Sequence, residues 1–229
     1  MHTQKRFHAP ALALLVAVAA CPTVSAAEKK TGPERWESSI AKFEEEDRKN
    51  PPTTGGVLFI GSSSVRMWKT LAEDFPGADT INRGFGGSEV SDSIHFADRI
   101  VLPYKPRTIV LYAGDNDISR DKTAAQVFDD YKTFVKTVRK HLPKTRIAFI
   151  AIKPSLKRWE LAPEMKKANE KIRRYCAWRR RLDYMDIWTP MLGADGTPRP
   201  ELFAKDGLHL NAAGYELWTS VIRPFVNKR

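Results

Sequence analysis

The stretch VLFIGSSS at residues 57–64 joins a wholly apolar run to a turn of glycine and serines. Four consecutive apolar residues without alternation are typical of a short strand buried on both faces. Two similar runs follow, TIVLYA at residues 108–113 and RIAFIAI at residues 146–152. Because such strands occur in parallel sheets that helices cover on both sides, the three runs predict an α/β fold.

Segments with a helical spacing of apolar residues separate these strands. Residues 123–141, for example, place Val127, Tyr131 and Val138 on one face of a long helix. Strands and helices that alternate at these lengths predict a parallel sheet with helices on both faces, and in such folds the site lies at the carboxyl ends of the strands. Further helices are predicted at residues 28–50, 62–75, 91–101, 163–181 and 211–226, with short strands at 80–82 and 184–187.

The first 26 residues have the pattern of a bacterial secretory signal. Lys5 and Arg6 precede the apolar run ALALLVAVAA at residues 11–20, and the small residues of VSA at 24–26 follow. This order predicts a signal peptide over residues 1–26 and an exported protein, periplasmic or extracellular. An alternative stays open, because VAAC at residues 18–21 resembles the lipobox of bacterial lipoproteins. The signal would then span residues 1–20, and a lipidated Cys21 would anchor the chain to a membrane.

Length and composition fit one soluble globular domain behind that signal. The chain has 229 residues, of which 42% are hydrophobic and 28% charged. We expect an N-terminal helix and linker at residues 27–56 and the domain at residues 57–229. Cys21 and Cys176 are the only cysteines, which excludes a disulfide framework and a cysteine zinc site.

The balance of charge is basic. The formal net charge is +11, and removal of Lys5 and Arg6 with the signal lowers it by two, to +9. A basic surface favours anionic lipid headgroups or polysaccharides. We do not expect a nucleic-acid partner, because the chain carries no nucleic-acid-binding motif and is predicted to be exported.

Three polar motifs follow predicted strands. The first is the serine turn at residues 61–64, where a hydroxyl at a strand-to-helix turn can meet a ligand and a backbone N–H lies at a helix N-terminus. The second is NRGFGGS at residues 82–88, whose glycines allow backbone N–H groups to approach a ligand closely. The third is GDND at residues 114–117, where the Asn116 amide could bind an oxyanion. Each motif has a plain structural alternative, a helix cap in the first case and turns in the others.

His209 is the best candidate for a general base. Of the five histidines, His2 and His8 lie in the predicted signal, and His95 and His141 lie in predicted helices. Only His209 has an acid at a short fixed spacing in a loop, Asp206, which could accept a hydrogen bond from its other ring nitrogen. A loop in which Asn211 caps the last helix is the structural alternative.

Together these motifs resemble the blocks of the GDSL/SGNH hydrolase family. The resemblance implies a flavodoxin-like three-layer sandwich with about five parallel strands, with Ser63 as nucleophile and Asp206 and His209 completing a triad. It also implies an oxyanion hole made by the N–H groups of Ser63 and Gly87 and the side chain of Asn116, with no metal or cofactor. Ser62 occupies the place of the name-giving aspartate, so the resemblance is to a subgroup with Gly-Ser-Ser-Ser in the first block. This departure leaves Ser62 and Ser64 as alternatives to Ser63 for the nucleophile.

The function that this resemblance implies is hydrolysis of carboxylic esters. We expect short-chain or O-acetyl esters of carbohydrate, with a small molecule or a polysaccharide as the substrate, since the chain has no long apolar segment suited to a lipase lid. Two alternatives remain. One is a non-catalytic carbohydrate- or lipid-binding protein on the same fold. The other is a metal-dependent phosphoesterase that uses Asp115, Asp117, Asp206 and His209.

Overall fold

The computed structural model describes Met1 and residues 32–226. The predicted signal segment beyond Met1, with Cys21, lies outside the described residues. Five parallel strands form one sheet in the order β2-β1-β3-β4-β5, which confirms the predicted α/β class. The strands are β1 (Val57–Gly61), β2 (Thr80–Gly84), β3 (Thr108–Tyr112), β4 (Arg146–Ile150) and β5 (Leu182–Met185).

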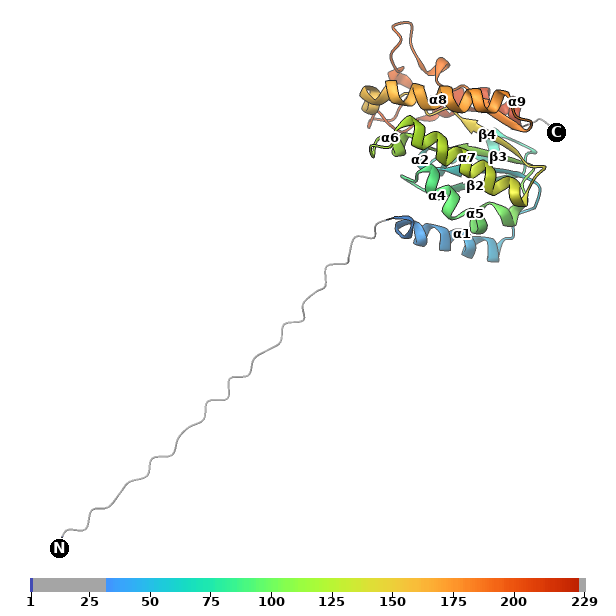
Figure 1. Cartoon of the computed structure of the whole chain (residues 1–229), viewed down its shortest axis with the longest axis vertical. Helices are drawn as coiled ribbons and strands as arrows, with labels where there is room; N and C mark the ends of the chain where they lie inside the picture. The colour runs from blue at the N-terminus through green and yellow to red at the C-terminus, as the bar shows by residue number, and fades with distance from the viewer. Residues whose placement is uncertain (2–31, 227–229) are drawn as a thin grey trace. The chain divides into compact units, whose positions relative to one another are not determined.

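Helices follow each of these strands, and Figure 1 shows them packed along the sheet. The α-helices are α1 (Glu37–Lys49), α2 (Ser63–Arg66), α3 (Leu71–Asp74), α4 (Val90–His95), α5 (Ala97–Ile100), α6 (Asp115–Ile118), α7 (Ala124–His141), α8 (Ala162–Ala177) and α9 (Ala212–Val226). The 3₁₀ turns are η1 (Pro33–Trp36), η2 (Leu102–Tyr104), η3 (Leu156–Leu161), η4 (Thr189–Met191) and η5 (Pro200–Leu202).

The helices cover both faces of the sheet. Leu111 and Phe149 are register partners on neighbouring strands and therefore point to the same face, whereas Tyr112 points to the opposite one. The Phe149 ring contacts Tyr131 of α7, and the Tyr112 ring contacts Trp218 of α9. Helices α7 and α9 consequently lie on opposite faces, and α4 and α8 pack on either side of α7.

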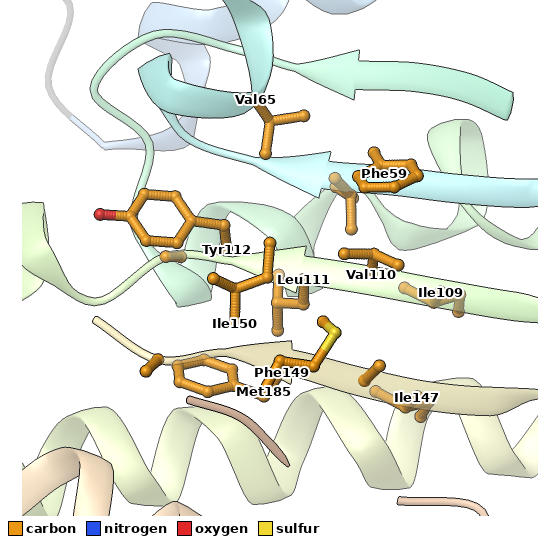
Figure 2. Close-up of a cluster of buried hydrophobic side chains, with 14 of the residues drawn as sticks. Phe59, Val65, Ile109, Val110, Leu111, Tyr112, Ile147, Phe149, Ile150 and Met185 are labelled. Carbon is orange, nitrogen blue, oxygen red and sulfur yellow. The ribbon is translucent and has the colours of Figure 1, made fainter. Parts of the chain in front are cut away.

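The core lies between the sheet and these helices. Every residue of β1 and β3 is buried, as the unbroken apolar runs predict. Figure 2 shows Phe59, Val110 and Leu111 among the side chains of this cluster. No helix among the described residues is long and apolar enough to cross a membrane.

Two predicted helices are each divided into two short ones. The segment 62–75 forms α2 and α3, and the break buries Trp68, whose indole donates a hydrogen bond to Asp74 at 2.6 Å. The segment 91–101 forms α4 and α5, with the buried Phe96 at the break. In both places burial of a large aromatic ring outweighs the continuation of the helix.

The N-terminal helix α1 is bound firmly to the domain by charged side chains. Asp47 accepts hydrogen bonds from the Arg83 guanidinium and, at 2.5 Å, from the Tyr104 hydroxyl. Glu44 and Arg99 form a second, bidentate pair at 2.7 Å. Ile40, on the same helix, is fully buried against the domain. Residues 32–56 are therefore a structural part of the described domain.

Candidate active site

Ser63 is the one serine of its turn that is accessible. The turn begins at Gly61, whose φ is +132° and where a Cβ atom would lie 1.8 Å from the carbonyl oxygen of Tyr112, so only glycine fits. Ser62 and Ser64 are 0% and 1% exposed, whereas Ser63 is partly exposed as the first residue of α2. Burial thus favours Ser63, the serine that the family resemblance assigns as nucleophile, over its two neighbours.

His209 lies beside Ser63 although 146 positions separate them in the chain. Its Nε2 is 2.9 Å from the Ser63 Oγ, and its Nδ1 is 2.5 Å from Oδ2 of Asp206. A carboxylate can only accept, so Nδ1 carries the proton and Nε2 is free to accept the hydrogen bond of the serine hydroxyl. This tautomer is the one that a general base requires.

Asp206 is fixed by the backbone as well as by the histidine. Its Oδ1 accepts the N–H groups of Leu208 and His209, each at 3.0 Å. Partial burial of this carboxyl raises its pKa, but the hydrogen bonds from the His209 ring and from the two N–H groups outweigh burial and hold the pKa well below the ordinary value. Asp206 therefore stays ionised beside the His209 ring.

Gly87 and Asn116 reach the same groove from two other strand ends. The Asn116 amide donates one hydrogen bond to the Ser88 carbonyl at 3.0 Å, which ties the glycine loop to α6. The amide has a second N–H, and the described structure gives it no protein acceptor. With Ser63, both residues line an open groove of about 570 Å³.

A buried network of charges holds the Asn116 side chain in place. Its Oδ1 accepts hydrogen bonds from both terminal nitrogens of Arg158, at 3.1 and 3.2 Å. Arg158 is also 3.2 Å from Asp115, which pairs with the buried Lys153 at 3.1 Å. Burial raises the pKa of the Asp115 carboxyl, but Lys153 and Arg158 outweigh it and the net pKa is lowered. Because the oxygen of the amide faces Arg158, its nitrogen is the end left for Ser88 and the groove.

The two acids of GDND are structural and give the metal hypothesis no site. Asp117 is fully buried, accepts the backbone N–H of Val90 and lies 3.2 Å from Lys122. Burial raises the pKa of its carboxyl to about 6. Each carboxylate of the metal hypothesis thus has its own partner: Lys153 for Asp115, Lys122 for Asp117 and His209 for Asp206. Among the described residues no group of three or more His, Cys, Asp or Glu is arranged to hold a metal ion.

Several residues that line the groove belong to no motif in the sequence. Trp36 comes from η1 and lies with its ring 3.3 Å from the position of a Cβ on Gly87. Arg66, Arg120 and Arg158 supply three cations to the same lining. Trp36 and the three arginines come from segments far apart in the chain, and a single basic or aromatic residue carries no motif. The loop that carries His209 also contains the predicted helix cap. Asn211 caps α9 by accepting a hydrogen bond from the Gly214 N–H at 3.1 Å. The cap and the contact of His209 with Ser63 are therefore both present in this loop.

Solved structures share this architecture at low sequence identity. A Streptococcus pneumonia protein that carries a provisional assignment as a platelet activating factor is 20% identical, with a TM-score of 0.73 over 84% of this chain and 95% of that one. A GDSL-like lipase from Bacteroides thetaiotaomicron is 18% identical, with a TM-score of 0.72 over 82% and 97%. A carbohydrate esterase family 3 protein from Talaromyces cellulolyticus is 16% identical, with a TM-score of 0.60 over 76% and 96%.

The sequence itself matches a family model over most of the described domain. No curated protein matches the chain. The model of the GDSL-like lipase/acylhydrolase family matches residues 55–217, which contain all the serine, glycine, asparagine and histidine motifs described above. The chain therefore belongs to the GDSL-like lipase/acylhydrolase family, and it is a carboxylic ester hydrolase.

Proposed function

We propose that the protein cleaves short-chain or O-acetyl esters of carbohydrate through an acyl-enzyme on Ser63. The observation that carries the proposal is the chain of contacts from Ser63 through His209 to Asp206 at the edge of an open groove. A serine paired with a neutral imidazole, itself oriented by a carboxylate, is the arrangement that activates a hydroxyl as a nucleophile.

The proposed reaction has two halves. The Ser63 Oγ attacks the ester carbonyl carbon while Nε2 of His209 takes the hydroxyl proton, and Asp206 stabilises the imidazolium. His209 then gives that proton to the departing alcohol oxygen, which leaves an ester on Ser63. In the second half a water molecule loses a proton to His209 and attacks the same carbon. The acid departs and Ser63 recovers its proton.

Asn116→Ala should lower kcat about 10²–10³-fold, the usual loss when one oxyanion donor is removed. The amide is proposed to stabilise the oxyanion together with the N–H groups of Ser63 and Gly87. Steady-state kinetics on a short aryl ester measure the change, and the unfolding midpoint of the variant controls for damage to the Arg158 network. A folded variant with wild-type kcat would remove Asn116 from the oxyanion hole.

The character of the groove supports a polar substrate with a small acyl group. Its lining is dominated by Ser39, Asn116, His209 and three arginines, with Trp36 and Leu208 as its apolar members. Such a lining offers little apolar surface to a long acyl chain. One structural neighbour is a carbohydrate esterase, which agrees with this choice.

A panel of acyl chain lengths tests this substrate class directly. Using 4-nitrophenyl esters from acetate to dodecanoate together with acetylated xylan, we expect kcat/KM to be highest for acetate and to fall with length. Acetate release from the xylan should be lost in an Asp206→Asn variant. A maximum at eight carbons or longer would contradict the proposal and favour lipid esters.

We infer from residues 1–26 that the enzyme acts outside the cytoplasm. Expression in a Gram-negative host with N-terminal sequencing should show mature chains that begin at Ala27. Mature chains that begin at Cys21 and sediment with membranes, and a Cys21→Ser variant that is released from them, would establish the lipoprotein alternative instead. An uncleaved cytoplasmic chain would contradict export.

A further inference from the structure

Arg66 differs from the other arginines of the groove in having no acidic partner. Arg120 pairs with Glu89 at 2.7 Å and Arg158 with Asp115 at 3.2 Å. The described residues include no ion pair and no side-chain hydrogen bond for Arg66, which is exposed. Its charge is therefore available to a ligand, whereas the other two arginines already have acidic partners.

The place of Arg66 is fixed close to the reaction centre. It follows Ser63 by three positions on α2, so the two side chains lie on the same face of the helix. Its guanidinium lies against Gly86, where a Cβ atom would be 2.8 Å from Nε and 3.4 Å from Cζ. A larger residue at position 86 would displace the guanidinium. Gly86 thus makes room for a cation directly beside Gly87, one of the proposed oxyanion donors.

A second groove continues the site beyond Arg66. It has a volume of about 510 Å³ and shares Arg66 and Ser39 with the groove that Ser63 lines, which is called the catalytic groove below. Lys42 and Lys69 add two cations to its lining, and Glu46 is its only acid, 3.9 Å from Lys42. A substrate that extends from Ser63 in this direction passes Arg66 and then meets a surface with an excess of positive charge.

One wall of this second groove is made by α1. Ser39, Lys42 and Glu46 all belong to that helix, which precedes the segment 55–217 matched by the family model. The ion pairs of Asp47 and Glu44 described above hold α1 against the domain. The helix that carries the charged side chains of this wall is therefore held in a fixed position beside the groove.

We propose that Arg66 binds an anionic group, a carboxylate or a phosphate, carried by the ester substrate next to the bond that is cleaved. This rests on the proposed function and makes its substrate class more specific. A planar guanidinium presents paired N–H donors that match both anions. The positive lining beyond Arg66 adds attraction that falls with ionic strength.

Matched esters test the proposal. The probes are 3- and 4-acetoxybenzoate, 4-acetoxyphenyl phosphate and the neutral 4-acetoxybenzamide, all of which release acetate from a phenol. We expect kcat/KM of the wild type to be higher for at least one anionic ester than for the neutral ester. Arg66→Gln should lower the ratio of the anionic to the neutral kcat/KM about tenfold, as expected for the loss of one charge-assisted hydrogen bond. The carboxylate and phosphate arms identify the preferred anion. Lys140→Gln removes one charge from the exposed face of α7, outside both grooves, and should leave the ratio unchanged.

A binding measurement separates this proposal from the proposed reaction. In a Ser63→Ala background, calorimetric titration with the same anionic esters should show binding that weakens about tenfold on addition of Arg66→Gln, and Arg66→Lys should recover part of it. This result supports the subsite even if the wild type hydrolyses none of the esters, in which case only the proposed reaction fails. Equal binding of anionic and neutral esters, or no response to Arg66→Gln, overturns the subsite.

Discussion

Ser63→Ala should reduce ester hydrolysis by at least about 10⁴-fold, because it removes the atom that is proposed to become acylated. Without the nucleophile, a water molecule must attack the ester directly. Substrate binding and oxyanion stabilisation are then the only contributions to catalysis that remain. The measurement is kcat on a short aryl ester with enough protein to detect the residual rate. The unfolding midpoint should change little, since the Ser63 side chain is partly exposed and its only described hydrogen bond is to His209.

The neighbouring serines provide matched controls within the same turn. Ser62→Ala and Ser64→Ala remove a hydroxyl of the same size from buried positions. Both variants should keep kcat within about tenfold of the wild type, because a buried hydroxyl cannot reach a substrate. Activity that survives in Ser63→Ala and disappears in Ser64→Ala would transfer the nucleophile to Ser64.

His209→Ala should be the second large loss, about 10⁴-fold in kcat, the upper end of general acid–base catalysis. Without the imidazole, nothing at 2.9 Å from the Ser63 Oγ can take its proton or protonate the leaving alcohol. Added imidazole should restore part of the rate, since it can diffuse into the open groove and act as a base. Rates at several imidazole concentrations measure this rescue.

His141→Ala is the control for the histidine variant. His141 is exposed at the end of α7 and does not line the catalytic groove. Its replacement should leave kcat unchanged. Full activity in His209→Ala would contradict the assignment of the general base, whichever serine is acylated.

The fold could be predicted from the sequence because its strongest signals are local. The unbroken apolar runs predict the buried strands β1, β3 and β4, and the apolar face of residues 123–141 predicts α7, which Thr123 caps in the structure. The breaks at Trp68 and Phe96 could not be predicted in this way. They depend on where a large ring finds space in the core, which a periodic pattern does not contain.

The site was partly predictable for the same reason. Asp206 and His209 lie three residues apart, so their pairing is local, whereas the meeting of His209 with Ser63 requires the whole sheet. The family resemblance assigned Ser63, and the burial of Ser62 and Ser64 is a second reason for that choice which only the structure supplies. Asp115 and Asp117 look like metal ligands in the sequence, but in the structure Asp115 pairs with Lys153, 38 positions away, and Asp117 pairs with Lys122, five positions away.

The most direct test of the central claim is covalent labelling of the intact enzyme with a fluorophosphonate, followed by peptide mass spectrometry. Such probes form a stable adduct on an activated serine. We predict one adduct, on Ser63, which is absent in Ser63→Ala and forms far more slowly in His209→Ala. Labelling of Ser63→Ala at the wild-type rate, or an adduct that maps to Ser62, Ser64 or another residue, would contradict the account.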